Sequence, residues 1–267
     1  ERKSLLPCNW ISAPGVELES PVVMEFKLSF EVPEDINIRI HVSADQQYQF
    51  FVDDIFSGRG CEQKSPANWY FESYDIALSK GKHTISALVW NYGEHSPMNR
   101  MSIAPGFILI PAVRYTELLG TGIAPWQVRQ LTAYSFDSLK VVPGGWTSVA
   151  PHEIYDYCEN NSADWVEPLV MEPGINGLMS QSHDKRCLVP SPMPEFHSAK
   201  IDLGDIAYTF GAYDSDGRVP ANLENFNGDY TLQPDSEQRI IFDLDEYYCA
   251  FTKLKIRGGK GAKIRIT

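Results

Sequence analysis

The sequence predicts an all-β protein built from two jelly-roll-like β-sandwich domains. Short stretches of β-forming residues recur along the 267 residues, turn signals separate them about every 8–12 residues, and helical periodicity is almost absent. The texture changes at residues 143–165, which are acidic and loop-like. We therefore expect a first domain at residues 1–148 and a second at residues 149–267.

The first domain contains the clearest strand signals. Residues 37–42 alternate strictly, with Ile38, Ile40 and Val42 on one face. Asp53-Asp54 forms a two-residue connection whose turn type stays open, because Asp is less comfortable at positive φ than Asn or Gly. Residues 112–119 are the best helix candidate. Strands are expected at residues 22–32, 37–42, 48–52, 55–57, 83–90, 107–110 and 126–131.

The second domain contains a proline-rich segment. Residues 186–196 carry three prolines, which forbid a helix and favour an extended segment that covers a sheet edge. Strands are expected at residues 230–232, 239–244, 251–257 and 262–266. The last of these stops without a polar tail and residue 1 is Glu, so we expect a fragment of a longer polypeptide.

Composition excludes several function classes. The net charge is −12 and no cluster of Lys and Arg interrupts it, which argues against nucleic-acid binding. No apolar run is long enough to predict a membrane span. The five cysteines are scattered without a Cys-x-x-Cys pair, which excludes a structural zinc site or a thioredoxin-like pair. We predict no metal ligand and no cofactor, although the sequence leaves open whether calcium braces a sandwich.

No catalytic motif is present in the sequence. The six histidines lack metalloprotease spacing, and there is neither a Gly-x-Ser-x-Gly elbow nor a glycine-rich phosphate loop. Carboxylates are plentiful, so their proximity along the chain identifies no glycosidase pair. The sequence gives no catalytic residue.

Aromatic residues suggest one binding surface. Sugar C–H faces pack on aromatic rings while acids and amides take the hydroxyls, so two aromatic-rich segments could together form such a platform. The alternative is that alternate aromatic residues of a strand point into the core. The candidate carbohydrate-binding residues are Trp69, Tyr70, Trp90 and Tyr92, with Asp45, Arg59 or Glu94 as polar partners.

Several segments, taken in order, resemble the non-catalytic N-terminal part of bacterial α-L-rhamnosidases of glycoside hydrolase family 78. The segments are residues 48–60, 74–90, 121–129, 153–165, 186–195 and 242–264. Asp53-Asp54 departs from the family's usual Asn-Gly or Asp-Gly, and Gly122 stands where Asp is common. The resemblance implies galactose-binding-like sandwiches that precede a catalytic (α/α)6 barrel. That barrel, with its acid and base carboxylates, would begin after residue 267.

The resemblance also implies a function. It predicts an accessory region that is inactive alone, packs against the barrel of the same polypeptide and contacts rhamnose-containing glycan, in the periplasm or at the surface of a bacterium. A stand-alone carbohydrate-binding module is the alternative. A complete enzyme or an unrelated adhesion module is a third hypothesis, which hydrolysis by this chain alone would favour.

Overall fold

The structure is a computed structural model, and it divides the chain into two compact units, residues 1–194 and 195–267. It describes residues 4–61, 65–137, 151–156, 158–159, 163–176, 185–194, 199–201, 203–211, 230–232, 235–250, 254–259 and 261–265. Within these ranges strands dominate, so the all-β prediction is confirmed. None of the helices in these ranges has the length and apolar character needed to span a bilayer.

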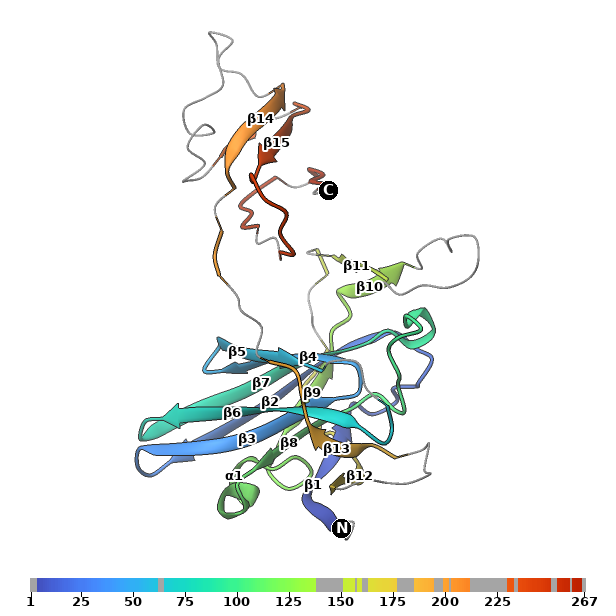
Figure 1. The fold of residues 1–267 in the computed structure, drawn as a ribbon, viewed down its shortest axis with the longest axis vertical. Coiled ribbons are helices and arrows are strands. Elements are labelled where there is room, and N and C mark those ends of the chain that lie inside the picture. The colour runs from blue at the N-terminus through green and yellow to red at the C-terminus, as the bar shows by residue number, and fades with distance from the viewer. Residues whose placement is uncertain are drawn as a thin grey trace. The chain divides into compact units, whose positions relative to one another are not determined.

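The first sheet of the first unit closes into a ring. Most of its neighbours are antiparallel, but β13 runs parallel to both β12 and β6. A single pairing, Ile11 with Phe107, closes the ring between β1 and β8. In hydrogen-bonding order the strands are β1 (Ser4–Ser12), β12 (Leu169–Asn176), β13 (Cys187–Pro190), β6 (Trp69–Leu78), β3 (Ile36–Ala44) and β8 (Phe107–Pro111). Two of these strands, β3 and β6, lie side by side in Figure 1.

The second sheet has five antiparallel strands. Its longest pairing joins β2 and β7 without a register shift, from Val22 opposite Asn91 to Val32 opposite Gly81. The order is β5 (Ile55–Gly60), β4 (Gln47–Val52), β7 (Gly81–Asn91), β2 (Val22–Val32) and β9 (Gln127–Gln130).

The main core draws residues from both of these sheets. The predicted alternation places Ile38, Ile40 and Val42 of β3 in this core, and β2 contributes Phe26 and Leu28 by the same period. Phe26 stacks on Phe107 with ring centroids 5.2 Å apart, so the aromatic contact spans the two sheets.

Turns and short helices join the strands. Asp53 and Asp54 both have positive φ, 50° and 61°, which is the geometry of a type I′ hairpin turn, and this settles the turn type that the sequence left open. The expected helix is split into a 3-10 turn, η2 (Val113–Tyr115), and a single α-helical turn, α1 (Thr116–Leu119). A further 3-10 turn, η1 (Gly93–His95), follows β7.

Two small sheets complete the described elements. In the first unit, β10 (Tyr134–Asp137) pairs with β11 (His152–Tyr155). In the second unit, β14 (Asp205–Phe210) pairs with β15 (Arg239–Asp243). The strand expected at 239–244 is therefore present, whereas residues 230–232, 254–257 and 262–265 are not strands.

The division between the units lies further along the chain than the expected one. The expected boundary at residues 148 and 149 falls outside the described residues. Strands β12 and β13 pair with β1 and β6, so the first unit continues to Pro194. The proline-rich segment therefore contributes a strand between two others instead of covering an edge. A parallel pairing so distant in sequence has no local signal.

Candidate functional site

The structure does not bring the predicted aromatic residues into an exposed platform. Trp69 is fully buried, with its ring edge against Trp10 at a centroid distance of 6.4 Å, and its indole Nε1 donates to the Ala44 carbonyl at 3.2 Å. Strand alternation directs this residue inward, so the expectation that it stacks on a sugar is corrected. Its neighbour Tyr70 is half-buried.

Trp90 and Tyr92 are also buried, at the end of β7. The β10–β11 hairpin covers them: Tyr134 meets Trp90 edge to face, and Phe136 meets Tyr92 in the same way. Trp90 Nε1 donates to Glu153 of the hairpin at 2.8 Å. Burial raises the pKa of the Tyr92 hydroxyl above its usual value. Neither ring offers a face to a ligand.

The polar candidates lie in different places. Arg59 is half-buried on β5, and its carbonyl accepts a hydrogen bond from the Tyr74 hydroxyl. Asp45 is fully buried between β3 and β4, while Glu94 is exposed on η1. Asp45 and Glu94 belong to the same region, because both lie beside a pocket that the sequence did not reveal.

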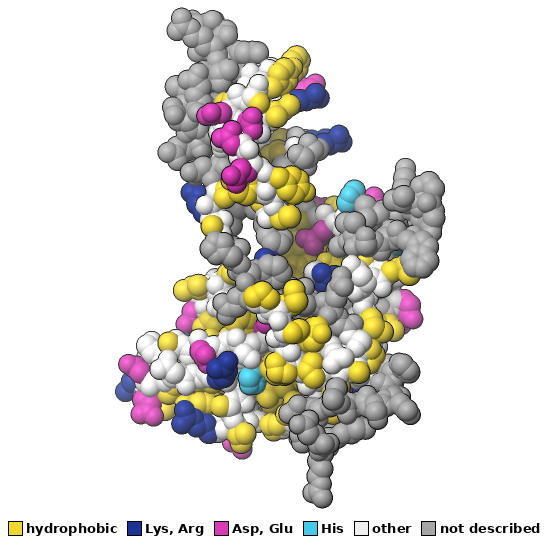
Figure 2. Space-filling model, in the orientation of Figure 1, with side chains coloured by type: hydrophobic (Ala, Val, Ile, Leu, Met, Phe, Trp, Pro, Cys, Tyr) yellow, Lys and Arg dark blue, Asp and Glu magenta, His cyan; other side chains and the backbone are white. Residues whose placement is uncertain are grey.

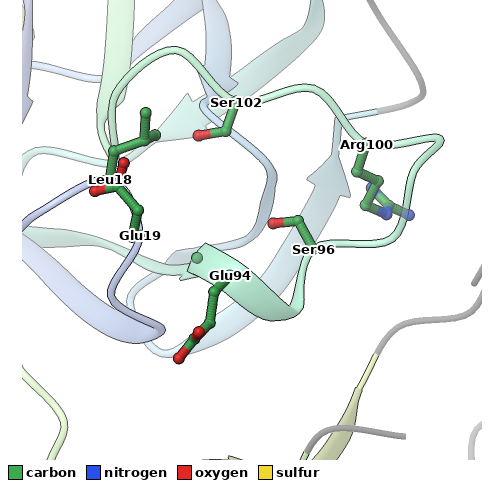
Figure 3. Close-up of a pocket in the computed structure, with 7 residues that line it drawn as sticks. Leu18, Glu19, Glu94, Ser96, Arg100 and Ser102 are labelled. Carbon is green, nitrogen blue, oxygen red and sulfur yellow. The ribbon is translucent and has the colours of Figure 1, made fainter. Parts of the chain in front are cut away.

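The pocket has a volume of about 230 Å³ and is formed by the turn before β2 and the loop after β7 (Figure 3). Figure 3 shows the hydroxyls of Ser96 and Ser102 pointing toward the side on which Leu18 and Glu19 lie. The lining residues are Leu18, Glu19, Gly93, Glu94, Ser96, Arg100 and Ser102. The two serine hydroxyls thus face the Leu18 and Glu19 side of the pocket, whereas the side chains of Glu94 and Arg100 point away from it (Figure 3).

Backbone contacts hold the two sides of the pocket together. The amide of Glu94 donates to the carbonyl of Glu19 at 2.8 Å. Gly93 has a φ of +51°, and a Cβ at this position would overlap the backbone of Glu19 and Pro21. Only glycine combines that backbone conformation with that close approach.

Side-chain hydrogen bonds fix the loop from within. Gln46 accepts from the amide of Tyr92 and donates to the hydroxyl of Ser96, each at 2.7 Å. The side-chain amide of Gln47 accepts from Arg100 at 2.6 Å and donates to the Tyr92 hydroxyl at 2.7 Å. Ser96 and Arg100 are therefore preorganised in the pocket wall before any ligand arrives.

Beneath the pocket lies a buried charge network. The carboxylate of Asp45 accepts from the Ser102 hydroxyl and from the amides of Ile103 (3.1 Å) and Ala104 (3.2 Å). It also accepts from Asn91 Nδ2 at 3.3 Å. Its cationic partner comes from a segment far along the chain.

Neither a candidate metal site among the described residues nor a patch of one charge on the visible face of the first unit is found. Among the residues that the structure describes, no group of three or more His, Cys, Asp and Glu side chains could hold a metal ion. On the visible face of the first unit, the coloured acidic and basic side chains are interspersed with apolar ones (Figure 2). The exposed Arg39–Asp75 pair, with nitrogen and oxygen 3.4 Å apart, is of this mixed surface type.

Solved structures include proteins with a fold similar to that of this chain. The family 78 rhamnosidase of Bacillus sp. GL1 matches 79% of this chain with a TM-score of 0.65 and 21% identity. The chain has the fold of part of a family 78 rhamnosidase. It spans only 22% of that protein's length. The similarity predicted from the sequence is therefore confirmed at the level of the fold.

Other solved structures match more weakly. The α-L-rhamnosidase from Dictyoglumus thermophilum has a TM-score of 0.44 and 13% identity, over 70% of this chain and 22% of its own. A lectin from Pleurotus ostreatus in complex with GalNAc has a TM-score of 0.38 and 14% identity, over 73% of this chain and 50% of its own. No protein-family model and no curated protein matches the sequence.

Proposed function

We propose that this chain is the accessory, non-catalytic β region of an α-L-rhamnosidase-like glycoside hydrolase, and that it packs against the catalytic barrel of the same polypeptide. The observation that carries the proposal is the fold match to the Bacillus sp. GL1 rhamnosidase, which covers most of this chain but about a fifth of the relative. The sequence adds support, because it holds none of the motifs by which nucleophilic or metal-dependent hydrolases are recognised.

A second function, glycan binding by this chain itself, is favoured by the pocket. The Ser96 hydroxyl, whose oxygen accepts from Gln46, has its proton available for a sugar oxygen, and the Glu19 carboxylate is an acceptor for sugar hydroxyls. Leu18 is 39% exposed and supplies an apolar contact for ring C–H groups. Small-molecule sites commonly combine such an apolar surface with a few convergent polar groups.

Two assays on the whole chain test these proposals. Incubation with an aryl α-L-rhamnoside is expected to give no hydrolysis, and turnover by the purified chain would contradict the non-catalytic role. Calorimetric titration with rhamnose-containing oligosaccharides is expected to show binding that Ser96→Ala weakens. Ser57→Ala is the matched control, because its hydroxyl bonds only locally, to the Ile55 carbonyl on β5. Equal affinity of the two variants would exclude the pocket as the site.

A further inference from the structure

The buried cation beneath the pocket comes from the far end of the first unit. Arg186, just before β13, has no exposed side-chain surface. Its Nη1 donates to Asp45 Oδ1 at 3.2 Å and to the Ala104 carbonyl at 2.7 Å. Its other side pairs with Glu172 of β12. The guanidinium carbon lies 3.7 Å from the ring centroid of Trp10, so an aromatic face covers the guanidinium plane.

The Asp45 carboxylate therefore contacts two separate segments, the loop of residues 102–104 and Arg186. One set of its contacts holds Ser102, Ile103 and Ala104, which form the pocket wall or continue it. The other is the ion pair with Arg186. A buried carboxylate is tolerated only when it is paired and hydrogen-bonded, so losing Arg186 from this position leaves Asp45 undercompensated. Arg186 and the donors of residues 102–104 therefore stabilise the same buried charge.

We propose that Asp45 is the positioning residue of the pocket, and that it couples the shape of residues 102–104 to the docking of the β12–β13 segment through Arg186. The proposal rests on the proposed glycan binding at this pocket and deepens it. Sugar binding and segment docking then favour each other, because each stabilises the same arrangement of the Asp45 contacts. Such coupling is reciprocal by thermodynamic necessity.

Glu172 offers the sharpest variant, because it touches Arg186 and does not line the pocket. Its side chain is 34% exposed, so Glu172→Gln keeps the side-chain shape and removes the negative charge that holds the second side of the buried Arg186 guanidinium. The matched control is Glu25→Gln, which weakens an Arg–Glu pair of similar geometry, 2.6 Å from Arg129, on the five-stranded sheet.

The experiment measures two quantities on the full chain. Hydrogen exchange of the Ile103 and Ala104 amides is expected to quicken in Glu172→Gln and to stay unchanged in Glu25→Gln. Affinity for a rhamnose-containing oligosaccharide, measured by calorimetry, is expected to fall by about two- to thirtyfold in Glu172→Gln only, the range covered by coupling between neighbouring side chains. Global unfolding is measured alongside, so that general destabilisation is separated from the local effect.

The outcomes separate the two proposals. Unchanged exchange at residues 103 and 104 in Glu172→Gln, or an equal change in the control, overturns the coupling while leaving glycan binding intact. If no oligosaccharide binds the wild-type chain, glycan binding at the pocket fails, and the exchange measurement still decides whether Arg186 and Asp45 couple the two segments. Faster exchange together with unchanged affinity also overturns the positioning role.

Discussion

Replacing Trp69 with Ala distinguishes a core residue from a sugar platform. Trp69 is fully buried, packs edge-on against Trp10 and donates a hydrogen bond to the Ala44 carbonyl. Truncating a buried Trp to Ala costs about 3–5 kcal/mol, from lost transfer free energy and from the cavity that remains. With a urea dependence of about 2–3 kcal/mol/M, the unfolding midpoint is expected to fall by about 1–2 M.

Tryptophan fluorescence during urea unfolding is the assay. All six tryptophans lie between residues 10 and 165, so the signal reports the first unit alone. Ile55→Ala is the control, because this side chain is 70% exposed and its truncation is expected to change stability by no more than about 0.5 kcal/mol. An unfolding midpoint for Trp69→Ala equal to that of the control, with glycan binding abolished, would refute the burial argument and restore the platform.

Three further predictions follow from the contacts. Arg186→Leu leaves Asp45 buried without its cation, so the free energy of unfolding in urea is expected to fall by about 3–5 kcal/mol. Losing an exposed ion pair costs at most ~1 kcal/mol. A decrease of that smaller size would contradict the buried network. Gly93→Ala is strained at positive φ, so it is expected to lower the melting temperature and to abolish glycan binding at the pocket. A wild-type melting temperature and affinity would contradict the close approach of Gly93 to Glu19. Hydrogen bonds to Asp53 and to a backbone carbonyl raise the pKa of His83 above 6.5. The stability that they contribute is therefore complete below pH 6.5 and is lost as pH rises through the raised pKa. Asp53→Asn is expected to flatten the plot of unfolding free energy against pH in that range, and an unchanged plot would contradict the role of Asp53.

The fold was predictable wherever local signals specify strands. The alternation of Ile38, Ile40 and Val42 predicted their burial, and the hairpin at Asp53-Asp54 was predicted at the correct position. Period-2 patterning is sufficient for such elements because each strand buries one face. The strands β12 and β13 were missed, since their partners are distant in sequence and prolines within them (Pro173, followed by Gly174, and Pro190) argue against a strand.

The candidate site was less predictable. Asp45 and Glu94 were predicted as polar partners of an aromatic platform, whereas in the structure they lie at or beneath a pocket assembled from two distant turns. The contact between Asp45 and Arg186 joins residues 141 positions apart, and no spacing rule connects them. Trp69 and Trp90 were misplaced because composition shows that a segment is aromatic, while the phase of the strand and the β10–β11 cover decide which rings are exposed.

The most direct test of the account maps where a glycan contacts this chain. Isotope-labelled protein would be titrated with L-rhamnose and with a rhamnose-containing oligosaccharide while backbone amide shifts are followed by NMR. The account predicts saturable shifts at the amides around Ser96, Arg100 and Ser102, with little change at Trp69. Shifts confined to another surface, or none at any sugar concentration reached, would contradict glycan binding at the pocket.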